Sequence, residues 1–175
     1  EAAQLIKDPR LSDLMEELFA TARKYNTGVW TVTQNFLSFK EAALSSKIKI
    51  NTTTTIFLSH ANDEEAKRVI ADDFGLSAAE KEAFESLRTV KGEYSTALFR
   101  TQIGANLESE VVRIELSPFD YAVATSDKEE NRLLSKFAEI KGLNLVNACA
   151  EAAMLAYKKN MFVIDAVKDF LRGRI

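Results

Sequence analysis

Hydrophobic and polar positions alternate along Val29–Phe36, VWTVTQNF, and we take this run as the centre of the predicted fold. Bulky β-formers alternate there with hydroxyl side chains, directly after the turn-forming Asn26-Thr27-Gly28. Because helical patterns flank the run on both sides, we expect a buried strand of an α/β sheet. Ligands of such sheets gather at the carboxyl ends of the strands, which is where Gln34 and Asn35 fall. The alternative interpretation is that Gln34 and Asn35 only begin a loop.

Apolar residues at helical spacing mark the segment before this strand. Asp8 and Pro9 form a helix start, with Asp8 as the N-cap and Pro9 in the first turn. The following apolar positions define one face that we expect to be buried: Leu11, Leu14, Met15, Leu18, Phe19 and Ala22. Arg23 and Lys24 fall in the last turn, where their simplest role is to complement the negative end of the helix dipole.

More helix and strand signals follow the central run. A second strand is predicted over Thr53–Ser59, since β-branched and apolar residues dominate it, and His60 ends that strand. Three capping pairs predict helix starts: Ser38 with Glu41, Asn62 with Glu65, and Ser77 with Glu80. Gly75 is predicted to end the helix that begins near residue 62.

A β-hairpin is predicted at the edge of the sheet. Its strands are Tyr94–Gln102 and Glu110–Leu116, and Gly104-Ala105-Asn106 turns the chain between them. Apolar and charged residues alternate in the second strand, which is typical of an antiparallel strand with one face in water.

The pattern changes to helical spacing after Ser117-Pro118. A capping pair at Ser126 and Glu129 predicts a helix that Gly142 ends, and two further helical stretches follow. We therefore divide the chain into an α/β core, residues 1–117, and a helical carboxyl-terminal subdomain, residues 118–175.

Composition narrows the classes of protein that fit. A chain of 175 residues with 46% hydrophobic residues can bury a substantial core and is not globally disordered. Its net charge of -3 argues against a broad nucleic-acid or membrane-binding face, although a local basic groove stays compatible with it. Cys149 is the only cysteine, which indicates a reducing compartment. There is no signal peptide or membrane-length apolar run, and Glu1 in place of an initiator Met suggests a fragment.

Several familiar catalytic patterns are missing from the sequence. One histidine and one cysteine cannot build a typical zinc site. Ser59 and His60 are neighbours on a predicted strand and point to opposite faces, which disfavours a Ser–His dyad. No segment matches G-x-x-x-x-G-K-[ST], so the chain contains no phosphate-binding P-loop.

Four short motifs, in their order and spacing, resemble a family of motor proteins. They are Glu1-Ala2 with Gln4-Leu5, ARKYNTG at residues 22–28, VTQN at residues 32–35, and LSPFDYAVATSD at residues 116–127. The first three resemble the second half of a RecA-like motor domain, and within that class the TraC-type ATPases of conjugation and type IV secretion machines. The fourth, which leads into the helical tail, is similar to the carboxyl-terminal region of the same family. The resemblance covers nearly the whole chain.

This resemblance implies catalytic roles for three residues. Glu1 matches the glutamate that activates the attacking water at the end of the family's Walker B strand. Arg23 matches the arginine that reaches into a neighbouring subunit's nucleotide site, and Gln34 matches the polar residue that senses the terminal phosphate. Ala3 departs from the tryptophan common at its position, and the Walker A half of the domain is missing. The implied cofactors, ATP and Mg²⁺, therefore belong to the full-length protein only.

The chemistry of phosphoryl transfer suits these residue types. The reaction needs a positioned water and neutralised charge on the transferring oxygens. A carboxylate and an amide at adjacent strand ends can orient the water. An arginine supplied in trans neutralises charge and is worth ~10³–10⁵ in rate.

Taken together, the sequence predicts an α/β fold that is part of a RecA-like P-loop NTPase sheet, with an edge hairpin and a helical tail. The predicted function is the carboxyl-terminal portion of an ATPase that powers type IV secretion, conjugative pilus assembly and substrate transfer. The alternatives are a non-catalytic docking module of a secretion machine and a DNA-translocating motor like a coupling protein. We expect a hexamer, other secretion components as partners, and a cytoplasmic location at the bacterial inner membrane.

Overall fold

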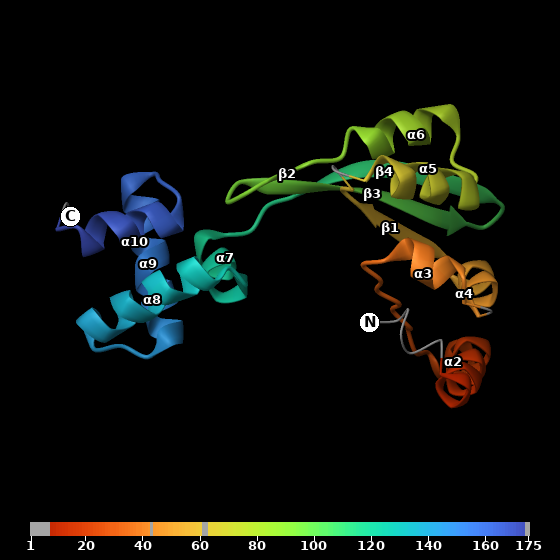
Figure 1. Cartoon of the computed structure of the whole chain (residues 1–175), viewed down its shortest axis with the longest axis horizontal. Coiled ribbons are helices and arrows are strands. Elements are labelled where there is room, and N and C mark those ends of the chain that lie inside the picture. Colours follow the sequence, from red (N-terminus) through yellow and green to blue (C-terminus); the bar gives the residue numbers. More distant parts are fainter. Residues whose placement is uncertain (1–7, 43, 61–62, 174–175) are drawn as a thin grey trace. The chain divides into compact units, whose positions relative to one another are not determined.

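The computed structural model describes residues 8–42, 44–60 and 63–173 (Figure 1). Its helices, in chain order, are α2 (Pro9–Thr21), the 3-10 helix η1 (Ala22–Tyr25), α3 (Phe36–Lys40), α4 (Ser45–Asn51), α5 (Glu64–Asp73), α6 (Ala78–Glu85), α7 (Pro118–Ala124), α8 (Lys128–Lys141), α9 (Leu145–Lys159) and α10 (Val163–Leu171). Its strands are β1 (Thr54–Leu58), β2 (Thr89–Val90), β3 (Tyr94–Ile103) and β4 (Asn106–Ile114).

The chain forms two compact units, each with its own hydrophobic core. Unit 1 comprises the described residues up to Arg88 together with Thr96–Val112. Unit 2 comprises Thr89–Ser95 and the chain from Arg113 onward. The division of the sequence after residue 117 stays a prediction, because a compact unit is not by itself an independently folding domain.

A four-stranded sheet runs in the order β1-β3-β2, and β4 pairs with β3. β1 and β3 are antiparallel, with Thr54 opposite Thr101 and Leu58 opposite Ala97. The second predicted strand and the predicted hairpin are therefore confirmed, although β4 begins and ends earlier than expected. The hairpin does not lie wholly at the edge of the sheet, because β3 pairs with β1, β2 and β4. His60 lies just beyond β1, with its Nδ1 atom 2.9 Å from the Leu58 carbonyl oxygen.

The core of unit 1 forms between the sheet, α3 to α6, and part of α2. Phe57 of β1 stands at its centre, with its ring centroid 5.0 Å from that of Phe74 and 5.5 Å from that of Phe84. Figure 1 shows α5 and α6 lying side by side along the sheet. Only part of the predicted buried face of α2 is covered, because Met15 and Phe19 pack against this core while three leucines of the same helix stay exposed.

The predicted central strand Val29–Phe36 does not form. Residues 29–35 are irregular, and Phe36 begins helix α3. The strand pairs β1–β3 and β2–β3 are antiparallel, and the expected buried strand with Gln34 at its carboxyl end is wrong for the described residues. A β-forming sequence becomes a strand only when a neighbouring strand pairs with it, and no described segment does so here.

The helix starts agree with the sequence in part. Asp8 caps α2 as predicted, and Ser77 with Glu80 forms a complete capping box on α6. Asp127 caps α8 in place of the predicted Ser126, and Asn35 caps α3 in place of Ser38. The predicted cap Asn62 lies outside the described residues, and the observed cap of α5 is the next residue, Asp63.

Unit 2 is a bundle of the four helices α7 to α10, which pack together in Figure 1. Phe137 of α8 is fully buried, and its ring centroid lies 4.9 Å from that of Phe170.

The predicted helix stops are confirmed in both units, since Gly75 and Gly142 end α5 and α8 with φ values of +57° and +65°. The turn between β2 and β3 belongs to unit 2 together with the helical bundle. A Cβ atom on Gly92 would lie 2.5 Å from the Phe162 ring, so only glycine fits against α10 there.

Candidate partner-binding site

The structure describes the three sequence-predicted catalytic residues only in part. Glu1 lies outside the described residues. Arg23 lies in η1, but its side chain is outside what the structure describes. Gln34 is exposed in a bend just before α3. Their catalytic roles, and the binding of ATP and Mg²⁺ that the resemblance implies, stay predictions.

The polypeptide between η1 and α3 is held at both of its ends. Asn26 has a φ of +51°, and the Thr27 amide donates to the Ala22 carbonyl at 3.0 Å, which closes η1. At the other end, the Asn35 side chain accepts from the Ser38 amide at 3.0 Å and starts α3. We call the residues between these anchors, Val29–Thr33, the extended segment.

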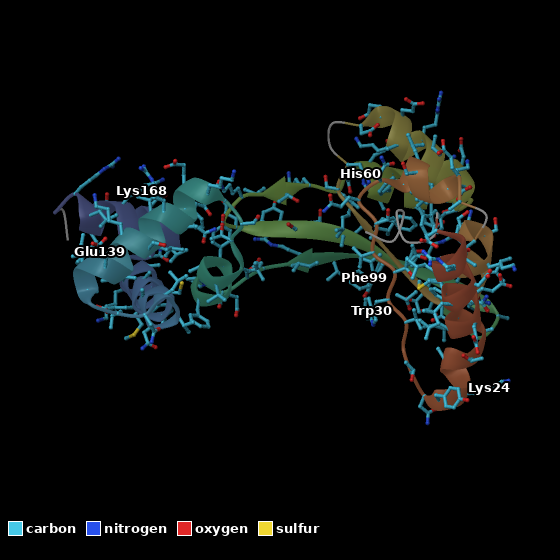
Figure 2. All side chains as sticks on the ribbon, turned by 60° about the horizontal axis from the view of Figure 1, so that its bottom comes forward. Lys24, Trp30, His60, Phe99, Glu139 and Lys168 are labelled. Atoms are coloured by element: carbon cyan, nitrogen blue, oxygen red, sulfur yellow. The ribbon has the colours of Figure 1, made fainter. Side chains whose placement is uncertain are left out.

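The extended segment shows the two-residue period that its sequence predicts, but it lies at the surface. Val29, Thr31 and Thr33 are partly buried. Trp30 and Val32 alternate with them and are 80% and 72% exposed. Trp30 is labelled on this stretch in Figure 2. A tryptophan this exposed is unusual for a surface with no partner, because its large apolar ring then stays in water.

Within the part of the chain that the structure describes, the backbone of the extended segment has unused hydrogen-bonding capacity. None of its amides or carbonyls bonds to the backbone of another described residue. The Thr31 hydroxyl is buried and likewise has no hydrogen-bond partner among the described residues. A segment whose amides and carbonyls bond to no described backbone can add a strand from a partner, and the exposed side chains then supply specificity. The segment can therefore act as a docking site for an extended peptide.

A second constellation of polar residues lies in unit 2 around Glu130, which is only 6% exposed. Its carboxylate accepts from the Thr125 hydroxyl at 2.5 Å and from the Tyr121 hydroxyl at 3.1 Å. Lys91, from the turn between β2 and β3, lies 2.9 Å from Glu130 and 2.8 Å from Asp127. A cavity of about 280 Å³ adjoins Lys91, Tyr121 and Asp127.

The electrostatics of this cluster favour one fixed charge state. Burial works against the charge of Glu130, but hydrogen bonds from Lys91, Thr125 and Tyr121 outweigh it and lower the pKa of the carboxyl. Hydrogen bonds to Asp127 and Glu130 raise the pKa of Lys91. Burial and the Glu130 carboxylate raise the pKa of Tyr121. Every member has a charged or hydrogen-bonded partner, so the cluster joins the β2–β3 turn to α7 and α8 rather than activating a nucleophile.

Sequence reasoning missed both features for identifiable reasons. It recognised the alternation around Trp30 but placed this side chain in a buried sheet. Lys91 and Glu130 are far apart in the sequence, and neither belongs to a motif, so only the fold reveals their contact.

Two negative findings concern the part of the chain that the structure describes. It contains no cluster of three or more His, Cys, Asp or Glu side chains arranged to hold a metal ion. It also contains no helix with the length and apolar character needed to span a membrane.

Comparison with known protein families identifies a match over more than half of the chain. The model of the family TraG-D_C, described as the TraM recognition site of TraD and TraG, matches residues 1–110. The matched region includes the extended segment and most of β4, and it ends before the helices of unit 2 begin. No curated protein and no solved structure matches the chain.

Proposed function

Since the chain belongs to the TraG-D_C family, whose model matches residues 1–110, we propose that it is part of a conjugation coupling protein and helps to recognise a TraM-type relaxosome protein. The family match is the observation that carries this proposal. Its description names TraD and TraG, so it supports the DNA-transfer alternative better than a TraC-type ATPase of secretion. The protein then acts where processed DNA is delivered to the secretion machine.

The extended segment is the contact that we propose for this recognition. It lies inside the matched region, and two of its side chains, Trp30 and Val32, are largely in water. Tyr25, just before it, is also exposed. Aromatic residues dominate binding energy at protein interfaces, because they bury a large area at a low cost in side-chain entropy. A strand from the partner would pair with backbone groups that bond to no described backbone, and it would cover the Trp30 ring.

The experiment measures binding of the chain to the purified TraM-type protein of the same conjugative system by calorimetry. Trp30→Ala should weaken binding at least about tenfold, because it removes a central aromatic anchor. Ile50→Ala is the matched control, since Ile50 is 83% exposed in the same matched region but lies on α4. Absence of binding by the unmodified chain would refute the recognition function. Binding that Trp30→Ala leaves unchanged would refute only the extended segment as its site.

The motor function stays a further proposal for the whole protein. There, Glu1, Arg23 and Gln34 would face ATP and Mg²⁺ that other segments of a RecA-like domain hold, in a hexamer at the bacterial inner membrane. Gln34→Ala in the full-length protein should then reduce ATP turnover while nucleotide binding persists, because the amide acts on the terminal phosphate. DNA-stimulated hydrolysis would favour a DNA motor, whereas hydrolysis indifferent to DNA would favour a secretion ATPase.

A further inference from the structure

Helix α9 is apolar on two faces, and only one of them is covered. Ala148, Cys149, Ala152 and Ala156 form the buried face inside the bundle. A second apolar stripe faces outward: Val146, Ala150, Ala153, Met154 and Tyr157. A helix with such a wide apolar surface is normally buried on both sides. The outer stripe therefore has the character of an interface.

The outer stripe of α9 is hollowed where it meets α7. A groove of about 340 Å³ is lined by Phe119, Ala150, Ala153, Met154, Tyr157 and Lys158, and we call it the α9 groove. The two alanines form a shallow floor between larger walls, so a side chain from another helix can enter. Lys158 is exposed at the rim and makes no ion pair with the residues that the structure describes.

Helix α2 carries an exposed apolar ridge with acidic residues along its border. Its outer leucines, Leu11, Leu14 and Leu18, recur at helical spacing, and Leu14 is 60% exposed. Asp13 and Glu17 follow next to these leucines on the solvent side and are exposed. The described residues thus include one apolar ridge with an acidic border and one apolar groove with a basic rim.

We propose that α2 of one copy of this chain docks in the α9 groove of a second copy. Leu14 enters between Phe119 and Met154, and Glu17 or Asp13 lies near Lys158. The charges are complementary, whereas packing two α9 stripes against each other would leave the lysines without acidic partners. This mode is a helix in a groove, in which leucines one turn apart act as anchors. It rests on surface complementarity alone and does not depend on the proposed function.

Such a contact joins two different surfaces, so it repeats from copy to copy. A contact of this kind closes into a ring when the rotation between copies fits and otherwise continues as an open chain. One helix in one groove is small for a protein interface, so the association should be weak and concentration-dependent.

Cross-linking between singly substituted chains tests the contact directly. All chains carry Cys149→Ala, and one population then carries Leu14→Cys while a second, with a larger tag, carries Met154→Cys. A bismaleimide with a reach of about 10 Å, the spacing of packed helix axes, joins cysteines across the interface. Since each chain has one cysteine, every cross-linked product joins two molecules.

The proposal predicts a product that joins the two populations and exceeds the products within either one. Ile50→Cys and Ile140→Cys are matched controls, since both side chains are exposed on other helices, α4 and α8. Failure of the mixed product to exceed the controls would overturn the proposal. A dominant product of Met154→Cys with itself would assign the groove to a second α9 instead. A chain with both cysteines that cross-links only internally would also overturn it.

Charge reversal tests the rim independently of the cysteines. Lys158→Glu and Glu17→Lys should each weaken self-association several-fold in sedimentation velocity, because each places like charges together. A mixture of the two single variants, Lys158→Glu and Glu17→Lys, should form reversed pairs and regain association. If the mixture associates no better than the single variants, Lys158 and Glu17 are not in contact across the interface.

Discussion

At the scale of single residues, Glu80 joins three elements of unit 1 through one carboxylate. It accepts from the Ser77 amide at 2.8 Å and thereby completes the capping box of α6. It also accepts from the Ser109 hydroxyl of β4 at 2.6 Å and pairs with Arg100 of β3 at 3.0 Å. Burial opposes its charge, but the hydrogen bonds from Ser109 and Ser77 and the charge of Arg100 prevail and lower its pKa to about 2.

This carboxylate should make unit 1 sensitive to acid. The pKa of Glu80 is lower in the folded chain than its ordinary value of 4.5, so its contribution to stability is present above pH 4.5. That contribution is lost as the pH falls from 4.5 toward 2, and it amounts to no more than about 3 kcal/mol. Urea unfolding at several pH values should therefore show Glu80→Gln less stable than the native chain at pH 7.

The unfolding free energies of the two chains should converge only below about pH 2, where Glu80 becomes protonated in the folded chain as well. Glu82→Gln serves as the control, because Glu82 is exposed on the same helix. A constant difference between Glu80→Gln and the native chain from pH 7 to pH 2 would contradict the ionic contribution.

The capping role of Glu80 was predictable from the sequence, but its ties to Arg100 and Ser109 were not. A capping box depends on residues three positions apart, which the sequence displays directly. The other contacts depend on how β3 and β4 lie against α6, which local patterns do not specify.

At the scale of elements, α9 ends at a residue that is not glycine. Asn160 has a φ of +50°, and its amide donates to the Ala156 and Tyr157 carbonyls at the end of the helix. This left-handed conformation suits glycine best, is tolerated by asparagine, and is costly for residues with other side chains.

Asn160→Ala should therefore lower the free energy of unfolding of the helical bundle by about 1 kcal/mol. Asn160→Gly should change it by less than about 0.5 kcal/mol, since relief of backbone strain and added freedom of the unfolded chain offset each other. Thermal unfolding followed by circular dichroism measures both, with Lys159→Ala as the control at the neighbouring helical position. Equal stability of the alanine and glycine variants would contradict the conformational explanation.

The elements that the sequence predicted well are those whose signals are local. β1, the β3–β4 hairpin and the stops at Gly75 and Gly142 depend on short patterns and turn residues. Asp127 caps α8 one residue after the expected Ser126, because neighbouring polar residues compete for the same role. The prediction of a strand at Val29–Phe36 was wrong, because a strand forms only when a second segment pairs with it. The pattern of one segment does not show whether such a partner lies beside it.

At the scale of the whole molecule, the two hydrophobic cores share no residue. Leu98 belongs to the core of unit 1 and Phe137 to that of unit 2, and both are essentially fully buried. Separate cores allow the units to lose stability separately, because a cavity in one removes no packing from the other.

Phe137→Ala should thus destabilise α8 to α10 by about 3–5 kcal/mol, and Leu98→Ala should destabilise the sheet by about 2–5 kcal/mol. Hydrogen exchange followed by mass spectrometry should show faster exchange of backbone amides only in the substituted unit. If either substitution accelerated exchange equally in both units, the chain would unfold as one cooperative block.

The burial of Cys149 makes its thiol a natural reporter of the opening of the helical bundle. Its thiol lies beneath α7, with Sγ 3.6 Å from the Ala122 carbonyl oxygen, and burial raises its pKa. A dissolved thiol reagent can reach the sulfur only in molecules where α7 has separated from α9. When separation and return are fast, the labelling rate divided by that of a free thiol equals the fraction of molecules open at any moment. The native cysteine thus reports the fraction of molecules in which the helical bundle is open, without an engineered labelling site.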